Sequence, residues 1–316
     1  MTEPLPVLFF DRPFPAEYAD LVEGRATVVG PDLAELAAAD GIIAGMHVWD
    51  GAALAGAPRA RVVSRTGVGY DTVDVAAATA AGIAVCYAPQ APTVSTAEHT
   101  MALLLAVTKG LPALTARSAA GLGGGVASTL ELDGATLGLL GFGRIARRVA
   151  TAAAGLGMRV ITHDPYLAAA LPGIDQLDGV PLVGIDELWG TSQVVSLHAP
   201  STPETRHIID DESLARFLPG AYLVNCARGG LVDQEALIRA LDNGQLAGAA
   251  LDVTEPEPLP VGHPLLTHPN VIVTPHVASS TAAGRRRLYE HAIDHALATI
   301  AGLPTSLVPE QATPTA

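Results

Sequence analysis

Cysteine and lysine are scarce in this chain of 316 residues. Its two cysteines, Cys86 and Cys226, cannot build a disulfide framework and lack the spacing of a zinc site, so a disulfide-rich secreted protein is excluded and no metal is expected. Lys109 is the single lysine, and 18 basic residues against 32 acidic residues give a formal net charge of −14. Because a chain this acidic repels a phosphate backbone, we expect no nucleic-acid partner.

Long apolar runs and a basic N-terminal segment are also missing. No run approaches the ~18 apolar residues of a membrane-spanning helix, and Glu3 and Asp11 stand near the N-terminus, where a signal peptide would carry basic residues. We therefore expect a cytoplasmic protein without a membrane partner. Hydrophobic residues are abundant, at 49% against 16% charged residues. That balance excludes disorder over most of the chain, and the length fits two domains.

The first hundred residues alternate short apolar runs with alanine-rich helical stretches, which predicts βαβ units and a parallel sheet. The predicted strands span residues 5–10, 26–29, 41–44, 61–64 and 83–87, and the predicted helices span 16–23, 33–39 and 74–81. A long buried helix follows, and the spacing of Ser95 and Glu98 predicts a capping box at its start. We expect this helix to cross between two domains, and the glycine-rich residues 121–128 to form a loop.

A second alternation begins at Thr136 and fits a doubly wound, Rossmann-like domain. Its predicted strands span residues 136–140, 159–163, 194–198, 221–225, 247–251 and 271–274, and its predicted helices include 144–154, 212–217 and 234–242. After Pro275 a helix is predicted over 282–300. Residues 303–316 contain few apolar side chains, which predicts a loose tail.

A glycine-rich turn follows the first strand of the second alternation. The run Gly141-Phe142-Gly143-Arg144-Ile145-Ala146 matches the pattern G-x-G-x-x-G/A, after a strand and at the start of a helix. The two glycines permit a tight turn and admit a pyrophosphate to the backbone, and the free amides of the helix suit phosphates. Asp164 ends the next strand, where a carboxylate binds the ribose hydroxyls of NAD and repels the 2′-phosphate of NADP. Alternatively, Asp164 only begins a turn.

Three polar residues follow the ends of later strands, where an α/β sheet places its ligand crevice. They are Arg228, Glu257 and His276. An arginine can bind a carboxylate through two hydrogen bonds and polarise a carbonyl, a histidine can give or take a proton near neutral pH, and a carboxylate beside the histidine favours the imidazolium. Together they predict proton transfer coupled to hydride transfer, although each alone also fits a surface or structural role.

The order of these motifs resembles the D-isomer-specific 2-hydroxyacid dehydrogenases, which include phosphoglycerate dehydrogenases and hydroxypyruvate or glyoxylate reductases. The resemblance runs from about residue 61 to residue 280. The motifs that carry it are Arg65-Thr-Gly-Val-Gly-Tyr-Asp71, Ala97-Glu-His-Thr-Met-Ala-Leu-Leu-Leu105, Leu139-Leu-Gly-Phe-Gly-Arg-Ile145, Asn225-Cys-Ala-Arg-Gly-Gly-Leu-Val-Asp233, Leu251-Asp-Val with Glu257, and Thr274-Pro-His-Val-Ala-Ser279.

The resemblance implies roles for individual residues. Arg228 would bind the substrate carboxylate and keto oxygen, His276 would be the acid in reduction and the base in oxidation, and Glu257 would keep His276 protonated. The amides of Val68 and Gly69 would bind the substrate carboxylate. The residues implied to bind the cofactor are Thr96, Gly141, Phe142, Gly143, Arg144, Ile145, Asp164, Ala199, Pro200, Thr205, Cys226, Ala227, Asp252, His276 and Ser279, with Asp252 on the nicotinamide carboxamide.

The resemblance also implies an α/β architecture with two domains. Residues 99–280 would form a Rossmann-like, doubly wound parallel sheet that binds NAD. Residues 1–98 and 281–316 would form a discontinuous, flavodoxin-like α/β substrate domain. The implied reaction is reversible hydride transfer between NAD, rather than NADP, and a D-2-hydroxy acid, which is the expected small-molecule partner, in a homodimer.

The substrate stays open at this point. Arg65 precedes the carboxylate loop, where an arginine can hold a phosphate in phosphoglycerate-type relatives, or it is an exposed arginine without such a role. His47 and Trp49 either shape the substrate pocket or only pack within their loop. Two other functions stay as alternatives, an NAD-sensing, corepressor-like binding module and a phosphite-type dehydrogenase on the same fold.

Overall fold

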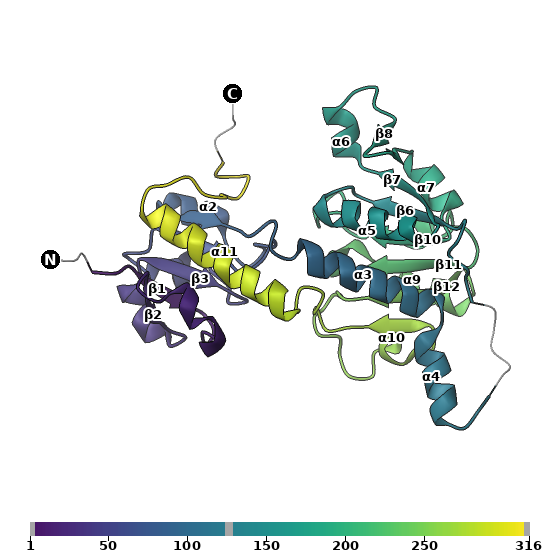
Figure 1. Ribbon diagram of the computed structural model, residues 1–316, viewed down its shortest axis with the longest axis horizontal. Coiled ribbons are helices and arrows are strands. Elements are labelled where there is room, and N and C mark those ends of the chain that lie inside the picture. The colour runs from purple at the N-terminus through teal and green to yellow at the C-terminus, as the bar shows by residue number, and fades with distance from the viewer. Residues whose placement is uncertain (1–3, 124–128, 313–316) are drawn as a thin grey trace. The chain divides into compact units, whose positions relative to one another are not determined.

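The computed structural model describes residues 4–123 and 129–312 (Figure 1). Contacts divide the chain into two compact units, Met1–Thr93 with Ser280–Ala316, and Val94–Ser279. Both ends of the chain therefore belong to the first unit, which is discontinuous in sequence. No helix within the described ranges is both long and apolar enough to cross a membrane.

The first unit contains a five-stranded parallel sheet with the order β2-β1-β3-β4-β5. This is the strand order of flavodoxin, as predicted for this part of the chain. The strands are β1 (Val7–Phe10), β2 (Thr27–Val29), β3 (Gly41–Ala44), β4 (Val62–Arg65) and β5 (Ala84–Cys86). The helices are η1 (Ala16–Leu21), η2 (Leu33–Ala38), α1 (Gly51–Ala55), α2 (Val75–Ala80) and α11 (Ala282–Ile300).

Both faces of this sheet are buried, which explains why its strands are continuous apolar runs. On one face, Leu8 and Ile43 pack with Ile293 of α11, the yellow helix along the sheet in Figure 1. On the other face, Phe9 and Ile42 belong to a separate cluster of buried residues. Residues 16–21 and 33–38 form 3₁₀ helices, and not the longer helices predicted, because short segments with only one or two buried side chains do not sustain α-helical turns.

The predicted loose tail is wrong up to residue 312. Val308 is fully buried, and its amide donates to the Val85 carbonyl over 2.9 Å. The Gln311 side chain accepts from the Val85 amide at 2.6 Å and donates to the Ile83 carbonyl at 3.0 Å. The segment therefore covers the outer edge of β5, whose backbone groups need partners. One buried valine and one glutamine are too weak a pattern to predict this docking, and residues 313–316 lie outside the described ranges.

The long helix α3 (Thr93–Thr108) starts before the predicted capping box, so that prediction is wrong. Pro92 stands directly before the first helical residue, and its fixed φ favours a helix start there. Ser95 consequently lies inside the first turn, where it is 2% exposed. The two units divide at the start of this helix, at residue 93, whereas the sequence analysis divided them at 98.

The second unit contains a six-stranded parallel sheet with the order β13-β12-β11-β10-β6-β7, and an antiparallel pair, β8 with β9. The strands are β6 (Thr136–Leu140), β7 (Arg159–His163), β8 (Gln176–Leu177), β9 (Val180–Pro181), β10 (Val194–Leu197), β11 (Ala221–Asn225), β12 (Leu246–Leu251) and β13 (Val271–Val273). In addition to α3, the helices of this unit are α4 (Leu111–Ala119), α5 (Arg144–Gly155), α6 (Pro165–Ala170), α7 (Ile185–Thr191), α8 (Asp211–Leu214), η3 (Gly229–Leu231), α9 (Gln234–Asp242) and α10 (Pro264–Thr267).

Helices cover both faces of this sheet, which is the predicted doubly wound arrangement. Leu104 of α3 and Val149 of α5 pack with Leu137 on one face. Leu188 of α7 and Leu237 of α9 belong to the cluster on the other face. Every predicted strand of this unit is present, with ends that agree within one residue. Within the predicted loop 121–128, residues 124–128 lie outside the described ranges.

Candidate active site

The glycine-rich turn lies between β6 and α5. Gly141 has φ +89°, and a Cβ atom on it would come within 2.9 Å of the His198 carbonyl oxygen, so the turn requires glycine. Gly143 precedes the first turn of α5, and no atom of the described residues lies within 4 Å of where its Cβ would be. Ala146 is fully buried, so α5 packs close to the sheet. Open space before uncapped helix amides fits the pyrophosphate of a dinucleotide.

Asp164 connects this turn to the next helix. Its Oδ2 accepts from the Phe142 amide at 2.9 Å, and its Oδ1 accepts from the Leu167 amide at 3.0 Å, which caps α6. Asp164 therefore begins the turn into α6, as the alternative predicted. The contact with Phe142 also fixes the glycine-rich turn, and the ribose contact stays a prediction.

The loop after β10 lies beside the glycine-rich turn, since Leu197 and Leu140 are register partners at the ends of β10 and β6. Ala199 and Pro200 are in this loop, and the Thr205 hydroxyl donates to the Pro200 carbonyl at 2.7 Å. Arg144 and Ile145 form the first turn of α5, directly after the glycine-rich turn. The second unit thus brings these predicted cofactor residues to the switch point of its sheet, between β6 and β10.

His276 and Glu257 form a direct pair. His276 Nδ1 lies 2.9 Å from Glu257 Oε2, and the side chains are 50% and 33% exposed. The other oxygen of Glu257, Oε1, accepts from the Thr254 amide at 3.1 Å. With both oxygens engaged, the carboxylate is fixed against the imidazole and leaves Nε2 of the ring to face a ligand.

Arg228 reaches the same region from the end of β11. Its Nη1 donates to the Ala227 carbonyl at 2.7 Å, and its own carbonyl accepts from Asn225 Nδ2 at 2.8 Å. A Cβ on the next residue, Gly229, would lie 2.1 Å from the Thr254 carbonyl oxygen. The arginine motif and the acid motif therefore pack backbone against backbone, which needs a glycine.

Charges in this cluster act on one another. The hydrogen bond that His276 donates to Glu257 is the main cause that raises the pKa of His276, and burial and the charge of Arg228 oppose it. Burial, the largest single influence, would raise the pKa of Glu257, but the hydrogen bond and charge of His276, with the Thr254 amide and Arg228, lower it overall. The pair therefore favours imidazolium beside carboxylate.

Asp252 holds the loop that carries His276. Its side chain is fully buried, and its oxygens accept from the hydroxyl of Thr274 at 2.6 Å and from the amides of Val277 and Ala278 at 2.9 Å each. The Asp252 carbonyl accepts from the His276 amide at 2.8 Å. These bonds keep His276 at φ +53°, a left-handed conformation that costs a non-glycine residue ~1–2 kcal/mol. The contact with the carboxamide stays a prediction.

His99 of α3 also belongs to this cluster, which the sequence did not predict. Its Nε2 lies 3.2 Å from Thr274 Oγ1 and 3.4 Å from Asp252 Oδ1. Because the Thr274 hydroxyl donates to Asp252, the His99 nitrogen donates to the threonine oxygen. The residue stands in the motif Ala97-Glu-His, but helical periodicity alone does not predict that its side chain contacts the end of a strand.

The remaining predicted cofactor residues lie on the same unit. Thr96 is buried in α3, and its carbonyl accepts from the Thr100 hydroxyl at 2.8 Å. Cys226 follows β11, before Ala227, and burial raises the pKa of its thiol to about 12, which makes it a neutral contact surface and not a nucleophile. Ser279 ends the histidine motif, half-buried.

The predicted substrate residues Arg65, Val68 and Gly69 belong to the first unit. Arg65 is 8% exposed, so the alternative of an exposed arginine is wrong. Its Nε donates to the Gly69 carbonyl at 2.8 Å and its Nη1 to the Ala44 carbonyl at 3.0 Å, which shapes the loop after β4. Trp49 is fully buried against Phe9, so it packs in the core of this unit.

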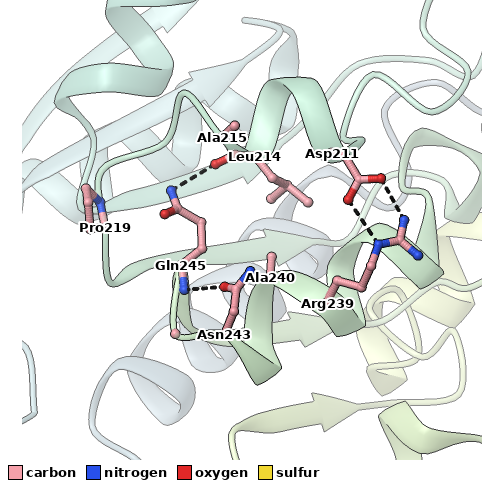
Figure 2. A pocket seen from close by; sticks show the side chains of 9 residues that line it. Asp211, Leu214, Ala215, Pro219, Arg239, Ala240, Asn243 and Gln245 are labelled. Carbon is pink, nitrogen blue, oxygen red and sulfur yellow. Dashed lines mark hydrogen bonds and ion pairs between the residues drawn. The ribbon is translucent and has the colours of Figure 1, made fainter.

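A cavity of about 470 Å³ lies elsewhere on the second unit (Figure 2). Arg239 and Asp211 pair across one wall, and the Gln245 side chain donates to the Leu214 carbonyl at 2.9 Å. Pro219 and Gln245 precede β11 and β12, so the cavity lies at the amino ends of these strands. The described residues that line it include none of the predicted site residues. Its polar side chains bond to one another, as Arg239 does with Asp211, or to backbone groups, as Gln245 and Asn243 do.

The fold and this cluster define a dinucleotide-binding α/β protein with an acid–base pair at the end of its sheet. Residues 101–278 match the family model described as "D-isomer specific 2-hydroxyacid dehydrogenase, NAD binding domain". The chain belongs to the D-isomer-specific 2-hydroxyacid dehydrogenase family, and these residues form its NAD-binding domain.

Known relatives agree with this assignment. A D-3-phosphoglycerate dehydrogenase of Mycobacterium bovis is 41% identical over 291 residues, which cover 89% of this chain and 54% of the relative. This chain spans about half the length of the curated relatives it matches, at 54% for the first of them. A solved structure from Thermus thermophilus has a TM-score of 0.86 at 37% identity, over 96% of this chain and 99% of that one.

A D-lactate dehydrogenase of Aquifex aeolicus, complexed with NAD and lactic acid, has a TM-score of 0.80 at 30% identity. The match covers 94% of this chain and 96% of that one. These similarities confirm the predicted fold class, and the named complex supports NAD as the cofactor of this fold.

Proposed function

We propose that this protein is an NAD-dependent dehydrogenase that interconverts a D-2-hydroxy acid and its 2-keto acid. The observation that carries the proposal is the contact of 2.9 Å between His276 Nδ1 and Glu257 Oε2, on the unit that matches the NAD-binding family model. Arg228 acts electrostatically on both members of this pair. A guanidinium, an imidazolium and a carboxylate form the set that reduction of a 2-keto acid requires.

In this mechanism each side chain has one task. NADH, when bound, would supply the hydride for C2 of the keto acid. Arg228 binds the substrate carboxylate and polarises the C2 carbonyl. His276, whose Nδ1 donates to Glu257, gives its Nε2 proton to the oxygen as negative charge develops there, and takes the proton back in oxidation. Glu257 stabilises the imidazolium and fixes the ring.

The cofactor residues support NAD over NADP. Gly141, Gly143 and the first turn of α5 would hold the pyrophosphate, and the Asp164 carboxylate beside them would repel a 2′-phosphate. Val68 and Gly69 would bind the substrate carboxylate through their amides. These contacts are proposals that soaked or co-crystallised NADH and a keto acid would test directly.

The test of the function is turnover. Purified protein mixed with NADH or NADPH and a panel of 2-keto acids should consume NADH, and the D-hydroxy acid should appear as product. The variant His276→Gln should bind NADH with nearly unchanged affinity and lose ~100-fold or more in turnover, because only the proton donor is removed. His291→Gln, a change in α11 of the first unit, is the matched control and should retain turnover. Equal loss of NADH binding and turnover in His276→Gln would mean that its role is misassigned.

The two alternatives are separable in the same experiment. Turnover of any keto acid argues against a corepressor-like module that only senses NAD. Oxidation of phosphite in the presence of NAD, with no keto-acid reduction, would favour the phosphite-type enzyme.

We also propose a homodimer in the cytoplasm. Support for the dimer comes from α4, which has no buried residue and stands away from the rest of its unit in Figure 1. Leu111 at its start and Leu122 beyond its end are 47% and 55% exposed. Sedimentation should give a dimer that Leu111→Asp dissociates, whereas Leu33→Asp, at a 53% exposed position of the first unit, should not. Two free cysteines support a reducing compartment, which cell fractionation would test.

A further inference from the structure

His99 of α3 is a polar side chain of the second unit to which the proposed reaction gives no role. Its side chain is 23% exposed, and its Nε2 lies 3.2 Å from Thr274 Oγ1 and 3.4 Å from Asp252 Oδ1. The same helix packs on the sheet through apolar side chains such as Leu104. Because burying a ring nitrogen costs free energy unless the nitrogen is hydrogen-bonded, these two contacts stabilise the imidazole in this place.

The direction of these hydrogen bonds follows from Asp252, whose side chain is fully buried. A carboxylate only accepts hydrogen bonds, and a threonine hydroxyl has one proton to donate. The Thr274 hydroxyl gives that proton to Asp252 Oδ1 over 2.6 Å, so its oxygen is left to accept from His99 Nε2. A chain of two hydrogen bonds therefore runs from the helix through Thr274 to the carboxylate.

This chain of hydrogen bonds connects the loop of His276 to a different part of the fold. The other donors to the Asp252 carboxylate within residues 4–123 and 129–312 lie on the loop itself and are Thr274, Val277 and Ala278. Those bonds fix the shape of the loop. His99, by contrast, ties the loop to α3, a helix of 16 residues that packs on the sheet.

The loop needs such a support because its backbone is strained. His276 has φ +53°, which a residue with a Cβ atom adopts only where the surrounding structure enforces it. Its Nδ1 also lies 2.9 Å from Glu257 Oε2, so a displaced backbone would separate the pair. A loop that is free to relax would therefore move the proton donor, although both members of the acid–base pair are still present.

We propose that His99 is a positioning residue for the dehydrogenase reaction, and that its hydrogen bond to Thr274 holds the His276 loop in the conformation that proton transfer requires. The inference rests on the proposed function. His99 acts through the loop and touches neither the keto acid nor the cofactor. Proton transfer requires an approach of ~2.6–3.2 Å between heavy atoms, so a small displacement of His276 lowers the rate of the chemical step. Binding of the keto acid by Arg228 depends on the end of another strand, β11, and should change little.

The experiment compares three replacements of His99. His99→Leu removes the donor, His99→Gln places an amide nitrogen where Nε2 lies, and His99→Asn places one nearer the backbone, where Nδ1 lies. Rates are measured with NADH and glyoxylate, hydroxypyruvate or pyruvate, whichever the unmodified protein reduces fastest. His99→Leu should lower kcat about tenfold or more, and should change the KM of the keto acid and the Kd of NADH about twofold or less. His99→Gln should restore most of kcat, and His99→Asn should not.

Amide hydrogen exchange tests the anchoring of the loop without any turnover. In the protein without NADH, His99→Leu should speed exchange at Val277 and Ala278 about tenfold or more, because both amides bond to Asp252. His99→Gln should restore their protection. Thr274→Val breaks the same chain of hydrogen bonds at its second member, so adding His99→Leu to it should lower kcat little further. Losses that multiply in the double variant would overturn the route through Thr274.

His268→Leu is the matched control, since it removes a largely buried histidine, 3.8 Å from Asp242, before the other end of β13. It should leave kcat and the exchange of both amides unchanged. An unchanged kcat in His99→Leu, or an equal loss in His99→Leu and His99→Gln at the same unfolding midpoint, would overturn the inference. Absence of turnover by the unmodified protein would overturn the proposed function and the role in catalysis with it, whereas unchanged exchange in His99→Leu would overturn the anchoring alone.

Discussion

Replacing Glu257 by glutamine isolates the electrostatic part of its contact with His276, because the side chain keeps its shape and loses its charge. The two contacting atoms are 2.9 Å apart, and the side chains are one third and one half exposed. Unit charges at ~4 Å attract by ~1 kcal/mol in water and by ~4 kcal/mol at an effective dielectric constant of ~20. Water screens a pair this exposed, so we expect about 1–2 kcal/mol, which is a factor of about 5–30 in imidazole protonation.

The sign of the pH effect follows from the direction of the pKa shift. The carboxylate raises the pKa of His276, so the imidazolium persists to higher pH in the unmodified protein. In Glu257→Gln that pKa falls. Keto-acid reduction consumes the imidazolium proton, so its decline with rising pH should begin at a lower pH than in the unmodified protein. Hydroxy-acid oxidation needs the neutral ring, so the pH at which the oxidation rate rises should also be lower. Below both pKa values the reduction rates should converge.

The assay is the initial rate of NADH consumption at saturating keto acid, between about pH 5 and about pH 9. Glu255→Gln is the matched control, because that carboxylate is two residues away and contacts Arg206 at 3.1 Å. Its profile should overlay that of the unmodified protein. Superimposable profiles for Glu257→Gln, or an equal displacement in Glu255→Gln, would refute the argument that this carboxylate sets the protonation of the histidine.

Four further substitutions test the site and the fold of the two units. Gly141→Ala should destabilise the second unit by ~1–2 kcal/mol in denaturant unfolding, because a positive φ is combined with a close contact to the His198 carbonyl. Gly143→Ala should leave stability unchanged, because its Cβ would lie in open space, and should weaken NADH binding about tenfold or more. Asp252→Asn should cost ~1–3 kcal/mol of stability and at least about tenfold in turnover, because an amide nitrogen would face a buried N–H donor. Val308→Ala should cost ~1–2 kcal/mol in the first unit by calorimetry, and no cost would mean that the terminal segment is not docked.

The parallel strands were readable from sequence because both sheets are covered on both faces. A strand buried on both sides is a short, continuous apolar run, and the runs ending at Leu140 and Asn225 have the predicted ends. The helices were less well predicted. The start of α3 depends on Pro92 and not on the serine–glutamate spacing, and the docking of residues 305–312 depends on the free edge of β5, which is a tertiary feature.

Residues of the site that follow strands were also predictable, since parallel strands bring their carboxyl ends to one edge. Sequence spacing therefore selected Glu257 and His276, and the geometry pairs them. It did not reveal how Arg65 is used, because an arginine before a loop is equally able to face a ligand or to bind carbonyls of its own loop. His99 was missed because its partners lie on two other segments, and no helical pattern records them.

Two carboxylates act on His276, and they do different work. Glu257 contacts the ring, and its hydrogen bond is the largest influence on the pKa of the imidazole. Asp252 contacts the amides of the loop, and its charge is a smaller influence on the same pKa. Glu257 therefore sets the protonation of the ring, and Asp252 sets its position. Loss of the first should move the pH profile, whereas loss of the second should lower the rate at every pH.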